Sequence, residues 1–133
     1  MKVFIGAFIF LSLLVSCNDK QEDQSAVTEK KEDLVEIKNG IYTEWYPGKK
    51  NIKFQGAQDA KAQRNGKWVF YSESGNELSI TFYSMGLKEG FTVVKYPSGR
   101  IHYRGEYRND TIVGLWTTYD ENGKVSKEKD FGY

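Results

Sequence analysis

The stretch Gly66-Lys-Trp-Val-Phe-Tyr71 recurs in altered form as Gly90-Phe-Thr-Val-Val-Lys-Tyr96 and as Gly114-Leu-Trp-Thr-Thr-Tyr119. The three stretches begin 24 residues apart, and a second glycine follows nine residues after each first one. These second glycines are Gly75, Gly99 and Gly123. A fixed period of this length is typical of repeat arrays, in which each unit buries its apolar face against its neighbours. The spacing therefore predicts a stack of similar units.

Each unit has the pattern of a β-hairpin. Residues 68–71 are β-branched or aromatic, residues 72–76 are small and polar, and residues 77–83 return to a strand composition. The second glycine of each unit supplies the positive φ that closes a short hairpin loop. The first glycines, Gly66, Gly90 and Gly114, are expected in the turns between hairpins. The sequence thus predicts an all-β array of about four antiparallel hairpins in a single elongated, twisted sheet.

The first unit is irregular, and the third departs from the others. Ile52-Lys-Phe-Gln-Gly56 matches Ile101-His-Tyr-Arg-Gly105, but the step from Gly48 to Gly75 is 27 residues instead of 24. We expect the Gly48–Ile52 and Gly56–Gly66 connections to hold the three extra residues. The third unit has Thr92 where its neighbours have tryptophan, so a row of stacked aromatics is interrupted there.

The repeated frame resembles a known family. A glycine followed by tryptophan and tyrosine, the Ile-x-Phe/Tyr-x-Gly return strand and the 24-residue step together resemble MORN repeats. The closest variant is the bacterial YwqK-type repeat that carries an antitoxin label. The resemblance covers roughly residues 39–133 and implies a hairpin-repeat fold. It also implies an antitoxin or immunity-like role, although the exported character of the chain does not suit neutralisation of a cytosolic toxin.

The N-terminus has the features of an export signal. Residues 1–16 combine a positive start with an apolar run that is too short to span a bilayer, as in a signal peptide. Leu14-Val-Ser-Cys17 resembles the lipobox of bacterial lipoproteins, which implies lipidation at Cys17; the alternative is an ordinary secretory signal. The polar, acidic stretch 18–23 resembles an export signal of Bacteroidota surface lipoproteins. We therefore expect an outer-membrane lipoprotein of the cell envelope, either surface-exposed or facing the periplasm.

Charge and composition divide the rest of the chain. Residues 17–36 are predicted to be the lipidated cysteine and a disordered acidic tether, because residues 18–36 carry seven acids against three lysines. Residues 37–133 are predicted to be the repeat domain, with 15 basic and 11 acidic residues. That balance is too mild to favour nucleic acid, so no nucleic-acid partner is expected.

The sequence does not predict an enzyme. His102 is the only histidine and Cys17 the only cysteine, so metal-ligand spacing and a nucleophile–base pair are both missing from the sequence. The loop Asp120-Glu-Asn-Gly123 resembles part of a calcium loop but lacks the further ligands that such a site requires. We therefore expect no catalytic residues, no metal and no cofactor.

The candidate binding face consists of aromatic and basic side chains. In the return strand of the third unit, Tyr103 and Tyr107 alternate with Arg104 and Arg108, which predicts one covered and one solvated face. The aromatics either cover a thin sheet or form a platform, and the arginines are either a solvated face or a dock for an acidic partner or lipopolysaccharide. The candidate residues are Trp68, Tyr71, Tyr103, Tyr107, Trp116, Tyr119, Arg100, Arg104 and Arg108.

The main functional hypothesis is a non-enzymatic interaction or scaffold module. It would be held at the membrane by lipid on Cys17 and would bind a partner protein through its aromatic face. The first alternative is a surface lipoprotein that binds carbohydrate on Trp and Tyr platforms. The second alternative is the antitoxin or immunity-like protein that the resemblance implies.

Overall fold

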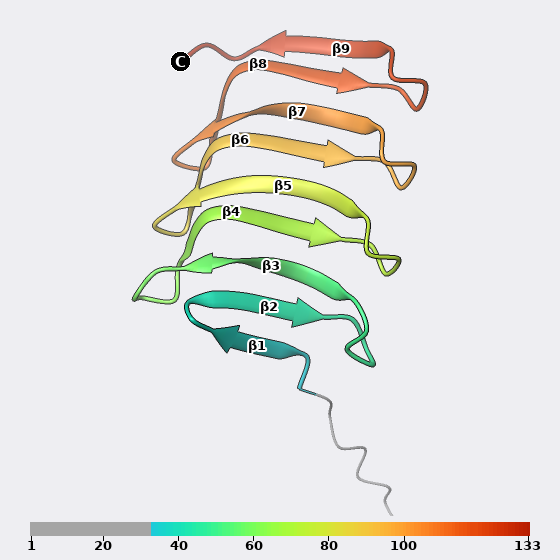
Figure 1. Cartoon of the computed structure of the whole chain (residues 1–133). Helices are drawn as coiled ribbons and strands as arrows, with labels where there is room; N and C mark the ends of the chain where they lie inside the picture. The colour runs from blue at the N-terminus through green and yellow to red at the C-terminus, as the bar shows by residue number, and fades with distance from the viewer. Residues whose placement is uncertain (1–32) are drawn as a thin grey trace, which may run out of the picture. The chain divides into compact units, whose positions relative to one another are not determined.

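The computed structural model describes residues 33–133, which form one antiparallel sheet of nine strands (Figure 1). Each strand pairs with its neighbours in the chain, so every connection is a hairpin and the sheet is open at both edges. The described residues contain no helix. This confirms the predicted all-β hairpin array. The strands are β1 (Val35–Lys38), β2 (Ile41–Trp45), β3 (Ile52–Gln58), β4 (Arg64–Tyr71), β5 (Glu77–Ser84), β6 (Leu87–Lys95), β7 (Ile101–Arg108), β8 (Thr111–Tyr119) and β9 (Val125–Asp130).

The predictions for the N-terminus lie outside the described residues, with one overlap. The signal peptide at 1–16, the lipidation of Cys17 and most of the tether at 17–36 belong to this part of the chain. The domain boundary predicted between residues 36 and 37 falls inside β1, which begins at Val35. β1 joins β2 through Asn39 and Gly40, whose φ values of 51° and 74° suit the Asn-Gly hairpin turn.

The loops after β4, β6 and β8 have the predicted glycine closure. In each of them the second glycine has positive φ and donates its N–H to a carbonyl three residues earlier. The N···O distances are 2.9 Å for Gly75 to Ser72, 2.8 Å for Gly99 to Tyr96 and 2.9 Å for Gly123 to Asp120. The three extra residues of the first unit are divided between the two connections: Gly48 and Ile52 are four residues apart where Gly99 and Ile101 are two apart, and Gly56 and Gly66 are ten apart where Gly105 and Gly114 are nine apart. The loop 59–63 between β3 and β4 replaces the two-residue turns found later.

The first glycines of the units are not in the turns between hairpins, so that prediction is wrong. Gly66, Gly90 and Gly114 lie inside β4, β6 and β8, with φ values of 73°, 95° and 61°. The sheet register shifts beside each of them, as expected where a β-bulge needs a residue with positive φ. The later turns consist instead of Met85-Gly86 and Asn109-Asp110.

Two of these bulges place a tryptophan directly over a glycine of the neighbouring strand. A Cβ atom added to Gly56 would lie 2.2 Å from Cδ2 of Trp68, and one added to Gly105 would lie 2.2 Å from Cδ2 of Trp116. Each indole N–H donates to the carbonyl of the residue after that glycine, Ala57 at 2.9 Å and Glu106 at 3.2 Å. We call this arrangement the Trp–Gly lock.

The middle of the sheet has a different pair at the same place. Thr92 occupies the tryptophan position of β6, and Thr81 occupies the glycine position of β5 directly opposite. The two hydroxyls are 2.9 Å apart and hydrogen-bonded, and Thr92 also donates to the Ile80 carbonyl at 3.1 Å. The loss of a large ring on one strand is therefore matched by a side chain gained on the other.

The hairpins alternate in type, so the effective repeat is two hairpins long. Tyr46 donates its hydroxyl to the Tyr71 carbonyl at 2.8 Å, and Tyr96 does the same to the Tyr119 carbonyl at 2.8 Å. Hairpins of the other type have Ser72 and Asp120 at this position. We call β2–β5 the N-terminal half and β6–β9 the C-terminal half; each contains one Trp–Gly lock.

The core is one side chain thick on each face of the sheet. Trp68, Val69 and Val113 are the buried apolar residues of the described chain, and the buried threonines have hydrogen-bonded hydroxyls. We call the side that carries the two locks the ring face. The other side carries a row of directly opposed residues that crosses all nine strands, and we call it the groove face. That row is Glu36, Thr43, Gln55, Val69, Ile80, Val93, Arg104, Thr117 and Glu128.

Candidate binding site

The predicted binding residues are divided between the two faces. Trp68, Tyr103, Tyr107 and Trp116 are on the ring face, where the two tyrosines contact Trp116 in the C-terminal half. The Tyr103 and Trp116 ring centroids are 5.9 Å apart, and those of Tyr107 and Trp116 are 5.2 Å apart. The candidate binding face of the sequence is therefore two surfaces instead of one.

The ring face is largely occupied by its own contacts. Trp68 is 2% exposed, and the guanidinium of Arg64 lies 4.8 Å from its ring centroid. Lys88 covers Tyr107 in the other half at 4.7 Å. Burial raises the pKa of Tyr103, with a smaller contribution from Tyr107. These rings cover the sheet, and Trp68 has no free face for a ligand.

The remaining predicted residues have local partners. The Arg104 guanidinium lies 5.7 Å from the Tyr119 ring centroid, and that of Arg108 lies 5.4 Å from the Tyr133 ring centroid. Arg100 donates to the Glu121 carbonyl at 2.5 Å and so links two neighbouring loops. Burial raises the pKa of Tyr71, with a further contribution from Glu77.

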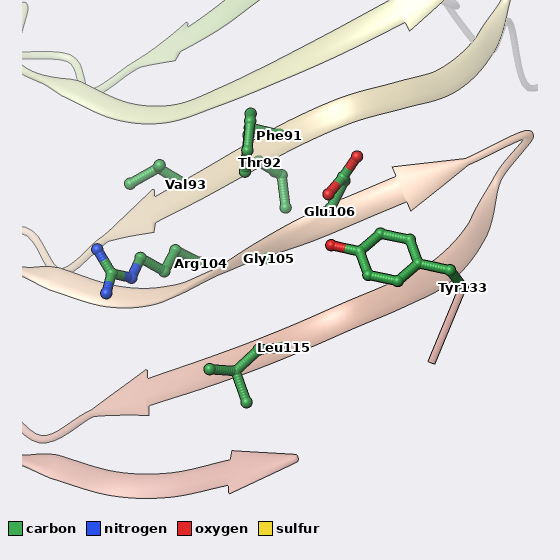
Figure 2. Close-up of a pocket in the computed structure, with 8 residues that line it drawn as sticks. All are labelled: Phe91, Thr92, Val93, Arg104, Gly105, Glu106, Leu115 and Tyr133. Atoms are coloured by element: carbon green, nitrogen blue, oxygen red, sulfur yellow. The ribbon is translucent and has the colours of Figure 1, made fainter. Parts of the chain in front are cut away.

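The groove face contains a hollow of about 410 Å³ in the C-terminal half (Figure 2). Figure 2 shows Arg104 and Val93 toward one end of it, and Glu106 and Tyr133 toward the other. Phe91 and Leu115 line the hollow between these ends. We call this hollow the groove.

Large apolar side chains of the groove are open to solvent. Phe91 is 68% exposed, Leu115 56% and Tyr133 84%. Tyr133 reaches the groove because the chain after β9 pairs with β8, where Phe131 donates to the Gly114 carbonyl and Gly114 donates to that of Gly132. Within residues 33–133, neither Arg104 nor Glu106 takes part in an ion pair. The groove thus offers an apolar centre between two charges of opposite sign.

The N-terminal half has different chemistry at the equivalent positions. The residue after the first glycine is Ile41 in β2 and Phe91 in β6. The residue before the locked glycine is Gln55 in β3 and Arg104 in β7. In β4 and β8, Lys67 corresponds to Leu115. The N-terminal half therefore has one apolar side chain beside an amide and an amine at these positions, whereas the C-terminal half has two apolar side chains beside a guanidinium.

Arg104 is the groove residue that belongs to the binding face predicted from the sequence, and the other groove residues do not belong to it. Phe91 and Leu115 each follow a repeat glycine directly, and a comparison of that one position across the units would have marked them. Tyr133 gave no such signal, because it reaches the groove only through the pairing of residues 131 and 132 with β8.

The described residues give no positive sign of other chemistry. His102 stacks beside Tyr96, with ring centroids 4.4 Å apart. Residues 33–133 contain no group of three or more side chains suited to holding a metal ion. In the same part of the chain, no helix is long and apolar enough to cross a membrane.

The fold and the groove define a class of protein, an all-β repeat protein with an open, amphiphilic surface site. Comparison with known families agrees with the repeat architecture: a model of the MORN repeat variant matches residues 112–131. The matched segment contains most of β8, the loop that follows and all of β9. No similar curated protein or solved structure was found.

Proposed function

We propose that the chain is a non-enzymatic binding module whose groove holds a segment of a partner protein. The observation that carries this proposal is the difference between the halves. At three equivalent positions, Phe91, Arg104 and Leu115 replace the residues of the N-terminal half. The match of residues 112–131 to the MORN repeat variant is consistent with a binding role.

The chemistry of the groove favours a peptide segment with an apolar side chain beside an acidic one. Covering exposed apolar area contributes about 25 cal/mol per Å², so Phe91 and Leu115 supply affinity. Arg104 can pair with a carboxylate of the segment, which fixes its direction and register. Glu106 at the other end disfavours a second acid.

The carbohydrate alternative receives less support from the side chains. It depends on exposed tryptophan platforms, and Trp68 is 2% exposed under its own neighbours. The antitoxin alternative has no side-chain arrangement that favours it. We propose display on the cell envelope from the lipobox-like Leu14-Val-Ser-Cys17, which lies outside the described residues.

Site-specific photo-crosslinking in the native host tests the groove. A photoreactive phenylalanine analogue at position 91 or 115 of the full chain is expected to give a discrete heavier adduct. The same analogue at the matched positions 41 or 67 is the control and is expected to give none. Arg104→Glu should abolish the adduct formed from position 91, while Gln55→Glu should not. Equal adducts from both halves would contradict the proposal.

Protease treatment of intact and lysed cells tests the location. Digestion of the wild type in intact cells indicates surface display, and protection until lysis indicates a periplasmic location. Cys17→Ala is expected to release the chain from the membrane fraction. If the wild type is already found in the soluble fraction and Cys17→Ala does not change that distribution, the lipoprotein proposal is wrong.

A further inference from the structure

The two open edges of the sheet differ in the charges they present. At one edge is β1, with the sequence Val-Glu-Ile-Lys, and at the other is β9, with Val-Ser-Lys-Glu-Lys-Asp. An exposed edge strand can pair with a strand of another molecule unless charge or shape prevents it. The two edges differ in the registers in which each can pair with its own copy.

The backbone of β1 determines which residues can pair across the open edge. Trp45 donates to the Leu34 carbonyl at 2.8 Å, and Glu36 pairs with Thr43. Because hydrogen-bonded pairs alternate along an antiparallel ladder, the N–H and C=O groups of Val35 and Ile37 point away from β2. The Val35 N–H donates to the Asp33 carboxylate at 3.2 Å. Ile37 is thus the centre of the open edge.

A symmetric antiparallel pairing must place residues of the same face opposite each other. Centring it on Ile37 pairs that residue with itself and puts Glu36 of each copy opposite Lys38 of the other. These opposed residues form a pair without mutual backbone hydrogen bonds, in which side chains are closest. A shift to Glu36 or to Lys38 as the centre puts like charges opposite each other. Only the Ile37 register is complementary in charge.

The β9 edge fails the same test. Phe131 donates to the Gly114 carbonyl, so the alternation directs the backbone groups of Glu128 and Asp130 outward. Centring a symmetric pair on residue 127, 128 or 129 puts a lysine opposite a lysine each time. Inward and edge charges of this kind are a known protection against edge pairing.

We propose that β1 binds β1 of a second copy of this chain, in antiparallel register centred on Ile37. Ile37 is 60% exposed and lies directly opposite Tyr42 on the ring face. In the pair, two Ile37 side chains meet at the axis and continue the ring face from one copy to the next. The groove of each copy lies in the half farther from β1, so both stay open. This inference does not depend on the proposed function.

Charge exchange tests the pairing. The full chain is purified in detergent, and its mass is measured by sedimentation over a range of concentrations. Glu36→Lys or Lys38→Glu alone is expected to lower the association constant roughly ten-fold, because two attractive pairs become repulsive. The double variant Glu36→Lys/Lys38→Glu should dimerise as the wild type does. An equimolar mixture of the two single variants should form the heterodimer.

Controls separate this pairing from other causes. Glu128→Lys on β9 should leave the wild-type association unchanged, and raised salt should weaken it because the paired charges are exposed. Glu36 and Lys38 are exposed, so thermal unfolding of the single variants should match the wild type. A monomeric wild type, single variants that associate normally, or growth into filaments through β1 and β9 would each overturn the proposal.

Discussion

The N-terminal and C-terminal halves build the same Trp–Gly lock but bury it to different extents. In the N-terminal half, Trp68 is 2% exposed and contacts Tyr42, Phe54 and Tyr83, with centroids 4.9 to 6.3 Å away. In the C-terminal half, Trp116 is half-buried, and its β9 neighbour is Lys129. An inner strand supplies rings on both sides of the lock, whereas an edge strand supplies charge.

The two halves share one backbone arrangement but differ in how well their side chains are packed and covered. The N-terminal lock is the best-packed point of the described chain, and Arg64 covers its rings at distances of 4.7 to 5.3 Å. The C-terminal half is less well covered on its ring face and carries the groove on its other face. We infer that the first half mainly stabilises the sheet and that the second carries the proposed binding groove.

Replacing the tryptophan of each lock should give the largest loss of stability, and the loss should differ between the two halves. Trp68→Ala is expected to lower the free energy of unfolding by about 3–5 kcal/mol, because it empties a buried site. Trp116→Ala should cost about 2 kcal/mol, since part of its ring is already solvated. Denaturant unfolding followed by circular dichroism measures both. Equal losses, or a larger loss at Trp116, would contradict the proposed difference between the halves.

Adding one methyl group beneath each indole is a smaller perturbation of the same kind. A Cβ at Gly56 or Gly105 would lie 2.2 Å from ring atoms, so the tryptophan must move. We expect Gly56→Ala to cost about 2–3 kcal/mol and Gly105→Ala about 1–2 kcal/mol, because Trp116 has room to shift toward the edge. In a Trp68→Ala background the cost of Gly56→Ala should disappear. A persistent cost would show that backbone strain is responsible instead.

The fold could be predicted from the sequence because the turn glycines and the strand composition repeat at a fixed spacing. The Trp–Gly locks could not be predicted in this way. The sequence predicts turns at Gly66 and Gly114, because a glycine with positive φ serves a bulge and a turn equally well and the sequence does not distinguish them. The pairing of Gly56 with Trp68 depends on register across strands, which only the assembled sheet provides.

The site was predicted in part for a related reason. The sequence marked Trp68 and Trp116 as candidates because large aromatics are common at binding surfaces, yet they pack over glycines and help cover the sheet. Arg104 was found by its alternation with Tyr103. Phe91 is not predicted as a site residue from the sequence, because single exposed apolar residues are common on protein surfaces. It becomes a candidate binding residue only when the structure shows it in one hollow with Leu115 and the charged ends of the groove.

Installing a third lock at the junction of the halves should sharpen the comparison. Thr92→Trp alone is expected to destabilise the sheet, because the indole meets the Thr81 side chain. Thr81→Gly alone loses the hydrogen bond between the hydroxyls and adds a glycine inside a strand. The free energy of unfolding of the double variant should be about 1 kcal/mol higher than the value predicted by adding the effects of the two single substitutions. Additive effects in denaturant unfolding would mean that the pair at this position is not coupled.

Alkaline titration should give the smallest effect and compares the two halves through their tyrosines. Burial raises the pKa of Tyr42, with Glu44 adding to the shift, and burial also raises the pKa of Tyr103 above the ordinary value of 10.0. Folding therefore favours the neutral phenols. Their contribution to stability is complete below pH 10.0 and is lost as the pH rises through the folded-state pKa.

The free energy of unfolding, measured from pH 8 to about pH 11, should accordingly fall in the upper part of that range. Tyr42→Phe and Tyr103→Phe should each reduce the fall. Burial is the first cause of the shift at both tyrosines, and Tyr42 also donates its hydroxyl to the Glu44 carboxylate at 3.4 Å, so Tyr42→Phe removes that hydrogen bond as well. A fall that neither substitution changes would assign the alkaline loss to other groups and would leave the covering role of these two rings without support.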